Sequence, residues 1–191
     1  MIINGELKPG QKLYQDDLAA RLGISRTPLV SAFSKLEQEN LVITQPRRGA
    51  YVKQYTDKEL LDICNIRASL ESLGVREAAA VSKPEDWALL ETHLVDFDRA
   101  VENNDEYGYK QADYNFHMEI LRCSGNKFLY DMLHSFIIIV INMNDFVIDK
   151  ELSRVEYYKI LDAIKNRNSE LAELLMDRHT ERPCQLLKNK Q

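Results

Sequence analysis

The sequence has few of the residues that build disulfide frameworks and no apolar run long enough to cross a membrane. Its only cysteines are Cys64, Cys123 and Cys184, which are far apart and never in a Cys-x-x-Cys pair. Cysteines used in this way are typical of reduced thiols in the cytosol. The longest apolar run, residues 136–141, falls far short of the roughly 20 residues that a membrane-spanning helix needs. No signal-peptide pattern follows Met1, so we expect a cytoplasmic protein without membrane contact.

Turn-forming residues are scarce in the larger, C-terminal part of the chain. Four of the seven glycines and three of the five prolines lie within residues 1–55. The same segment carries eight lysines and arginines against five acidic residues, whereas residues 56–191 carry seventeen against twenty-five, and the whole chain has a net charge of −5. These changes predict two domains, residues 1–55 and residues 56–191. The positive balance of the first domain permits contact with phosphate groups without requiring it.

The first domain carries the pattern of two short helices followed by a hairpin. Apolar spacing predicts a helix of about two turns over residues 16–22 and an amphipathic helix over residues 27–40. Ser25 or Thr27 is expected to cap the second helix. The β-rich stretch 41–52 is interrupted by a Pro/Gly turn, which predicts a hairpin.

The spacing of Ala19, Gly23 and Leu29 favours a helix-turn-helix. The first helix of that motif needs a small residue where it packs on the second helix, and the turn needs a residue that tolerates positive φ. Together with the basic hairpin that follows, the spacing predicts a winged helix-turn-helix. Three apolar neighbours are expected to be buried as support: Leu18, Leu22 and Ile24.

The start of the second helix and the tip of the hairpin supply the candidate DNA contacts: Ser25, Arg26, Thr27, Arg47, Arg48 and Gly49. Recognition helices present their first residues to base edges in the major groove, where Arg26 could donate two hydrogen bonds to guanine. The two hairpin arginines are expected to reach phosphate or the minor groove, and Gly49 lets the backbone approach closely. The alternative is an ordinary exposed helix start and a solvated turn.

From residue 56 onward the apolar periodicity is helical. The apolar run 136–141 is β-branched, but its flanks keep helical spacing, which indicates a helix buried centrally or at a subunit interface. Helices are expected near residues 57–81, 85–103, 106–123, 127–148, 152–166 and 169–182. The expected fold class is therefore mainly α: an N-terminal winged helix-turn-helix followed by an all-helical antiparallel bundle of about six helices.

Asp113 and His117 are four residues apart in a predicted helix, so their side chains share one helix face. His179, in the last predicted helix, could converge with them inside the bundle. One carboxylate and two imidazoles suit a divalent transition metal of the zinc or nickel type, with water or a ligand carboxylate completing the shell. The alternative is a hydrogen-bonded Asp–His pair on a helix surface.

Residues 3–53 closely resemble the DNA-binding domain of the GntR family of bacterial regulators. The resemblance rests on the Gly5–Leu13 segment, on Leu22-Gly23-Ile24-Ser25-Arg26-Thr27-Pro28, and on Pro46-Arg47-Arg48-Gly49. It implies that Ser25, Arg26, Thr27, Arg48 and Gly49 contact DNA. The family usually has an arginine where this chain has Val30, so a guanine contact is lost or replaced by contact with a thymine methyl. The family also usually has a helix before this segment, and the N-terminus is therefore expected to be truncated.

Residues 60–182 resemble the helical ligand-binding FCD domain of the FadR branch of that family. The matching pieces are Arg67-x-x-x-Glu71, Asp113-x-x-Phe116-His117, Ser124-Gly125-Asn126, Ile160-Leu161-x-Ala163-Ile164 and His179. The resemblance implies a metal held by Asp113, His117 and His179 beside a small carboxylate effector. The usual fourth ligand is a histidine, and Tyr157 stands there; tyrosine is a poor ligand because its ordinary pKa is about 10.

The candidate effector-binding residues are Arg67, Asn126 and Tyr157. Arg67 could pair with an effector carboxylate; its alternative is a salt bridge with Glu71 one turn away. Without a metal, Tyr157 and the two histidines could hydrogen-bond an anion directly.

These features together predict a metabolite-responsive regulator that binds a two-fold operator in double-stranded DNA as a homodimer. Two other functions remain open at this stage. One is a metal-dependent enzyme of the helical bundle, for which no nucleophile–base pair or phosphate loop is present in the sequence. The other is an adaptor whose winged helix binds a protein instead of DNA.

Overall fold

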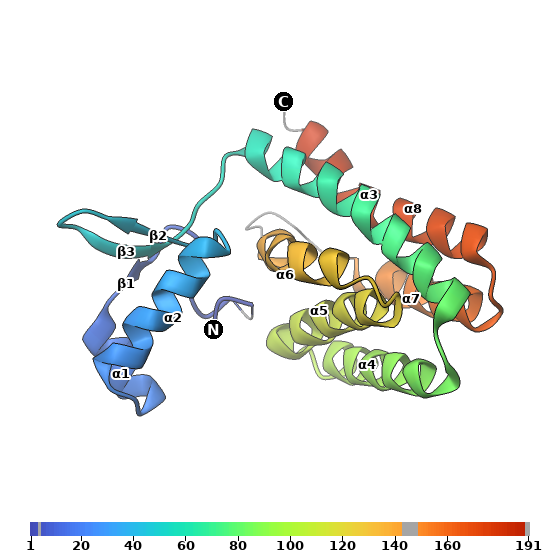
Figure 1. Ribbon diagram of the computed structural model, residues 1–191, viewed down its shortest axis with the longest axis horizontal. Coiled ribbons are helices and arrows are strands. Elements are labelled where there is room, and N and C mark those ends of the chain that lie inside the picture. The colour runs from blue at the N-terminus through green and yellow to red at the C-terminus, as the bar shows by residue number, and fades with distance from the viewer. Residues whose placement is uncertain (4, 143–148, 190–191) are drawn as a thin grey trace.

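The N-terminal region of the protein is a small winged helix-turn-helix that lies beside a larger bundle of helices (Figure 1). A computed structural model describes residues 1–3, 5–142 and 149–189. The N-terminal region consists of β1 (Lys12–Leu13), α1 (Gln15–Leu22), α2 (Arg26–Gln38), β2 (Val42–Gln45) and β3 (Gly49–Val52). The predicted hairpin is β2–β3, in which Val42 pairs with Val52 in antiparallel register.

Strand β1 was not predicted, because two residues are too short to carry an alternating pattern. It pairs with β3, so the sheet order is β1-β3-β2. One face of this sheet packs on α1 and α2 through a shared apolar cluster. Its members are Leu7, Leu13, Leu18, Ala19, Leu29, Phe33, Val42, Ala50 and Val52.

The turn between α1 and α2 has the predicted geometry at Gly23, whose φ of 66° is left-handed and whose amide donates to Ala20. Two expectations about its neighbours were wrong. Leu22 and Ile24 are 50% and 41% exposed, because Leu22 faces an open apolar depression between the two regions and Ile24 lies in the turn itself. Ser25 occupies the N-cap position of α2, but its side chain makes no capping hydrogen bond.

Within the described residues, six helices follow at nearly the predicted positions. They are α3 (Asp57–Val81), α4 (Pro84–Glu102), α5 (Glu106–Cys123), α6 (Lys127–Ile141), α7 (Lys150–Lys165) and α8 (Ser169–Lys188). The helix expected over residues 127–148 is α6, and residues 143–148 lie outside the described residues. Helix α8 continues six residues beyond its predicted end at 182, because Pro183 is buried inside it and packing there outweighs one lost backbone hydrogen bond.

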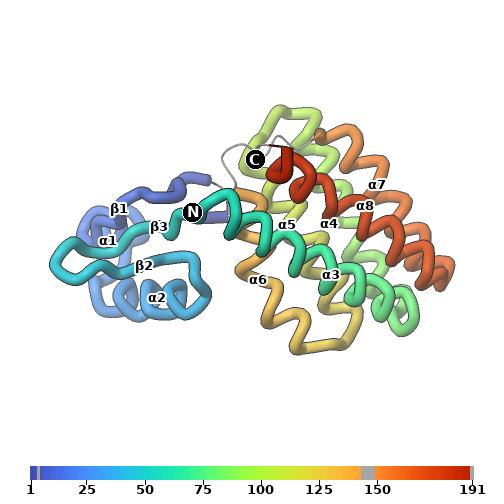
Figure 2. Tube along the Cα trace, turned by 90° about the horizontal axis from the view of Figure 1, so that it is seen from above, coloured from blue at the N-terminus to red at the C-terminus, as the bar shows by residue number. Residues whose placement is uncertain are grey.

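The longest described helices, α3 and α8, run side by side along one side of the bundle, with the end of α8 close to the start of α3 (Figures 1 and 2). The main core lies between α3, α4, α5, α7 and α8. Its largest fully buried side chains include Tyr157, Phe97, Phe116, Leu90 and Leu94. None of the described helices is both long and apolar enough to cross a membrane.

A short linker joins β3 to α3, and the two regions contact each other around it. Thr56 caps α3 by accepting a hydrogen bond from the Glu59 amide, while the Glu59 carboxylate accepts one from the Thr56 amide. Asn142 at the end of α6 donates a hydrogen bond of 3.2 Å to the carbonyl of Ile3. Apolar side chains from both regions fill the junction, among them Leu41, Ile138, Ile139 and Leu187.

Candidate functional site

The candidate DNA-contacting residues at the start of α2 are all exposed. Ser25, Arg26 and Thr27 lie there, and the Arg26 guanidinium forms an ion pair with the exposed carboxylate of Asp16 on α1. The start of α2 and the tip of the β2–β3 hairpin both point away from the helical bundle (Figure 1). The helix-turn-helix packing therefore leaves the first turn of α2 open to a ligand.

The hairpin tip presents two exposed arginines on an unusual backbone. Arg47 has a φ of 63° and Gly49 a φ of 100°, so a residue with positive φ lies on each side of Arg48. The carbonyl of Arg48 accepts a hydrogen bond of 3.3 Å from the Tyr51 hydroxyl. Gly49 is needed because a side chain at its φ would be strained.

Sequence reasoning missed Lys12 as a basic neighbour of this hairpin. Its ammonium lies over the rings of Tyr14 and Tyr51, at 5.4 and 5.9 Å from their centroids. The residue was missed because β1, which pairs Lys12 with Tyr51, has no recognisable pattern.

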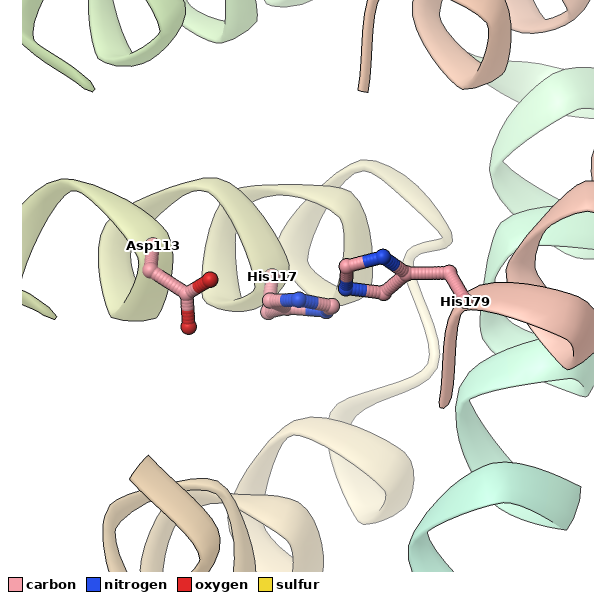
Figure 3. Close-up of side chains that lie close together, drawn as sticks. All are labelled: Asp113, His117 and His179. Carbon is pink, nitrogen blue, oxygen red and sulfur yellow. The ribbon is translucent and has the colours of Figure 1, made fainter. Parts of the chain in front are cut away.

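In the helical bundle, the three predicted metal ligands converge (Figure 3). Asp113 and His117 come from α5 and His179 from α8, and one donor atom of each lies within 4.8 Å of the others. All three side chains are buried, and the two imidazole rings stack with their centroids 5.2 Å apart. The helix-surface alternative for Asp113 and His117 is thus excluded.

A second carboxylate lies next to each histidine. Nδ1 of His179 is 2.8 Å from an oxygen of Glu156, and Nδ1 of His117 is 2.7 Å from an oxygen of Glu71. The second pair is close enough for an ion pair, although its angles are not those of a hydrogen bond. A carboxylate beside Nδ1 favours a proton on that nitrogen and leaves Nε2 to accept, which is how metal-binding histidines are usually oriented. In His179, Nδ1 also lies 3.1 Å from the Arg182 guanidinium.

Tyr157 lies in the same cluster and is fully buried. Its hydroxyl donates a hydrogen bond to Asp113 and lies 3.4 Å from Nε2 of His117. Burial raises the pKa of Tyr157 well above its ordinary value, and the negative charge of Asp113 raises it further. The phenol therefore stays protonated and acts as a hydrogen-bond donor.

Arg67 and Glu71, one turn apart on α3, form a buried ion pair with Nε and Oε1 2.5 Å apart. The alternative salt bridge for Arg67 is therefore present, yet Nη2 also lies 3.3 Å from Nε2 of His117. Burial alone would raise the pKa of Glu71, but Arg67 and His117 outweigh it and lower that pKa to about 2. Burial likewise acts to lower the pKa of Arg67, and the Glu71 carboxylate reverses this and raises it.

A cavity of about 310 Å³ opens beside the cluster. Arg67, Asp113 and His179 reach it from the cluster side. Its other polar lining includes Ser153, Thr180 and Arg182. Sequence reasoning missed Arg182, which donates to Glu156 at 2.6 Å and to Ser153 at 3.1 Å. These contacts cross from α8 to α7 and leave no pattern in the sequence.

Asn126 does not join this group. Its side-chain oxygen caps α6 by accepting from the Leu129 amide, and its amide donates to Glu77 at 3.1 Å. It lines a separate surface depression at the α5–α6 turn. Its position in the motif therefore reflects helix capping.

Comparison with known proteins matches both regions of the chain. Residues 1–52 match the gntR family of bacterial regulatory proteins, and residues 62–182 match the FCD domain. The HTH-type transcriptional regulator YdhC of Bacillus subtilis is 27% identical over 99% of this chain and 87% of its own length. The HTH-type transcriptional repressor RspR of Escherichia coli is 24% identical over 93% of this chain and 80% of its own.

Solved structures share the fold over nearly the whole chain. McbR/YncC of E. coli superposes with a TM-score of 0.86 at 24% identity, covering 99% of this chain and 92% of its own. A GntR transcriptional regulator from Rhodococcus sp. RHA1 gives a TM-score of 0.81 at 23% identity, covering 100% of this chain and 93% of its own. Both the winged region and the helical bundle thus have counterparts of the same arrangement.

Proposed function

Because this chain belongs to the GntR family of bacterial transcription regulators and carries an FCD domain, we propose that it binds a two-fold DNA operator as a homodimer and responds to a small carboxylate. It is a regulator rather than an enzyme, as the names of its relatives indicate. The proposed response to a carboxylate rests on one observation: Asp113, His117 and His179 converge, and Arg67 and a cavity lie beside them.

The proposed DNA contacts are Ser25, Arg26 and Thr27 in the major groove, with Arg47, Arg48 and Gly49 at the backbone or minor groove. Their exposure and the outward direction of both segments support this assignment (Figure 1). Arg26 is held only by a solvent-exposed ion pair with Asp16, which costs little to exchange for a base or phosphate.

Gel shift with DNA from beside the gene tests this assignment. Arg26→Ala should weaken binding by about 1–3 kcal/mol if a bidentate guanine contact is lost. Arg76→Ala is the matched control, because Arg76 is an exposed, ion-paired arginine on α3 in the helical bundle. Equal binding by both variants would contradict the assignment and favour a protein partner for the winged region.

The residues of the cluster fit a divalent transition metal with three protein ligands. Nε2 of His179 is left as an acceptor, Nε2 of His117 lies beside the Arg67 guanidinium, and Asp113 supplies an oxygen. Tyr157 fits the role of a donor to Asp113 better than that of a fourth ligand, because it stays protonated. When bound, a metal would supply positive charge that attracts a carboxylate.

The charges of the cluster favour a cation over a bare anion. The cluster contains three buried or half-buried carboxylates and two guanidinium groups, which leaves one negative charge in excess. The carboxylates are those of Glu71, Asp113 and Glu156, and the guanidinium groups are those of Arg67 and Arg182. An anion alone would add to this excess, whereas a divalent cation together with a monocarboxylate would balance it. We therefore propose metal-assisted binding of a small monocarboxylate in the 310 Å³ cavity.

Metal analysis of the purified protein and thermal shift with Zn²⁺, Ni²⁺ and small carboxylates test this proposal. We expect the metal to raise Tm, a chelator to reverse the rise, and His117→Ala to abolish it. His93→Ala is the control, since His93 lies on α4 outside the cluster. A Tm that no metal and no carboxylate changes would contradict the proposal.

The proposed dimer forms through the outer faces of α3 and α6. These helices pack on each other and expose apolar side chains, notably Phe128 at 81% and Met132 at 54%. A two-fold operator requires an isologous interface, in which one patch contacts its own copy. Met132→Glu should shift sedimentation toward the monomer, whereas Val95→Glu, at a similarly exposed site on α4, should not.

A further inference from the structure

Two of the three cysteines meet between the long helices of the bundle. Cys64 on α3 and Cys184 on α8 are both buried and belong to one apolar cluster. The two thiols interact, because each shifts the pKa of the other, that of Cys64 upward and that of Cys184 downward. The thiol of Cys184 also donates to the carbonyl of Thr180 at 3.6 Å. Cys123, on α5, is also buried but belongs to a different cluster. The chain therefore has one thiol pair and one separate thiol.

The thiol pair lies between the ligand cluster and the junction of the two regions. Helices α3 and α8 run side by side, and the end of α8 lies near the start of α3 (Figures 1 and 2). Leu60 and Leu187 line the cavity at the junction. About two turns further along each helix, Arg67 and His179 line the ligand cavity. On each helix the cysteine, Cys64 on α3 and Cys184 on α8, lies between the residue that lines the junction cavity and the residue that lines the ligand cavity.

We propose that Cys64 and Cys184 are a site of reversible oxidation, and that they form a disulfide between α3 and α8 when the protein meets a two-electron oxidant such as hydrogen peroxide. Disulfides that form in reducing compartments are usually transient and regulatory. A disulfide between Cys64 and Cys184 would fix α3 and α8 to each other between the ligand cavity and the DNA-binding region.

The chemistry begins at Cys184. The adjacent Cys64 thiol lowers the pKa of Cys184 by more than burial raises it, and the nearby positive charges of Lys188 and Arg67 lower it further. The thiolate attacks one peroxide oxygen, the O–O bond breaks, and a sulfenic acid and hydroxide result. The sulfur of Cys64 then attacks the sulfenic sulfur, the S–O bond breaks, and the hydroxide leaves. Two thiols and one peroxide thus give one disulfide and two waters.

A local opening of α8 can admit the oxidant to this buried pair. Cys184 directly follows Pro183, which has no amide hydrogen to bond the carbonyl of His179. The turn that carries Cys184 therefore lacks one of the hydrogen bonds that hold the helix closed. Segments with fewer backbone hydrogen bonds open at lower free energy than the rest of a fold.

The test is to treat the reduced protein with hydrogen peroxide and to count its thiols. We expect the three free thiols to fall to one and to be restored by a dithiol reductant. Peptide mapping of the oxidised wild-type protein should find Cys64 linked to Cys184 within one chain. This measurement needs no variant. Retention of all three thiols, or a link through Cys123 between chains, would overturn the proposal.

Single variants give an independent check. Cys64→Ala and Cys184→Ala should each abolish the internal link, while Cys123→Ala should leave it intact. Overoxidation of Cys184 to a sulfinic acid in the wild-type protein, without a disulfide, would overturn the proposal because Cys64 would then not be within reach.

The consequence for regulation rests on the proposed function. Oxidised protein should bind operator DNA, but its gel shift should no longer respond to the carboxylate that changes the reduced protein's affinity. A linked protein that responds like the reduced form would overturn this consequence. If neither form binds DNA, the proposed function fails, whereas the disulfide is judged separately by the thiol count.

Discussion

The Arg26 and Asp16 side chains of the winged region are each 68% exposed, whereas Arg67 and Glu71 in the bundle are 5% and 2% exposed. Both are arginine–carboxylate pairs, yet their surroundings are opposite. An exposed pair is screened by water and exchanges partners at little cost. A buried pair cannot lose one partner without leaving an uncompensated charge in a medium of low dielectric constant.

This difference separates two kinds of functional residue. The exposed residues at the start of α2 and at the hairpin tip can be replaced without disturbing the core of the winged region. Residues of the cluster also hold the bundle together, since Arg67, Glu71 and His117 contact one another in its interior. A substitution there must therefore preserve the balance of buried charge.

The largest expected effect is on stability, from Glu71→Ala. The variant leaves the Arg67 guanidinium buried without its carboxylate, so the free energy of unfolding should fall by about 3–5 kcal/mol. Urea unfolding followed by circular dichroism measures the loss. Replacement of both partners, Arg67→Met with Glu71→Leu, should recover most of it, because no unpaired charge remains. A loss below about 1 kcal/mol, the upper range for exposed pairs, would remove the contrast between the two regions.

A smaller effect, on DNA specificity, is expected from Val30→Arg. Val30 is 46% exposed and lies one turn after Arg26 in α2. An arginine there could donate two hydrogen bonds to guanine, which should favour one operator base by about 1–3 kcal/mol. Binding to operators that carry each of the four base pairs at that position measures the change.

Val30→Arg should leave the urea midpoint unchanged, since the side chain points to solvent. Equal strengthening on all four operators would contradict the prediction and indicate a phosphate contact. A large loss of stability would instead contradict the assignment of this face as free surface.

The fold was largely predictable because its signals are periodic and local. The helical patterns gave the bundle, and Gly23 marked the turn where a left-handed φ is required. The errors fall where local pattern is absent or is overridden by packing. Strand β1 has two residues, Leu22 lies beyond the closed core, and Pro183 stays inside α8 because it is buried there.

The candidate site was predictable only where its residues are close in the chain or belong to a motif. The four-residue spacing placed Asp113 and His117 on one face, and motif resemblance added His179. Glu156 and Arg182 were missed because their contacts join α7 to α8 through tertiary packing. Asn126 was assigned to the effector site from its motif alone, whereas the structure gives it the cap of α6.

A modest effect is expected at the linker between the two regions. Thr56→Ala removes the N-cap of α3 and should lower the free energy of unfolding by about 1 kcal/mol. Thr92→Ala is the control, because the Thr92 hydroxyl donates to a carbonyl within α4 and caps nothing. Equal losses in both variants would show that the capping box contributes nothing specific.

The contribution of this capping box to the free energy of unfolding should depend on pH. The hydrogen bond from the Thr56 amide lowers the pKa of Glu59. A lowered folded-state pKa means that the contribution is present above the ordinary glutamate pKa and disappears as the pH falls through the folded value. The difference between wild type and Glu59→Gln in urea should therefore shrink from neutral to acid pH.

The smallest effect on stability is expected from Asp62→Ala, which tests an exposed ion pair on the same helix as the buried one. Lys58 and Asp62 form an ion pair of 2.8 Å on α3 with the same four-residue spacing as Arg67 and Glu71. Their side chains are 77% and 56% exposed, so water and salt screen the pair. In addition, Lys58 precedes Asp62, and a pair with the cation first stabilises a helix less than the reverse order. The urea midpoint should stay within error of the wild type at low and high salt. A loss similar to that of Glu71→Ala would mean that helix spacing, and not burial, sets the strength of these pairs.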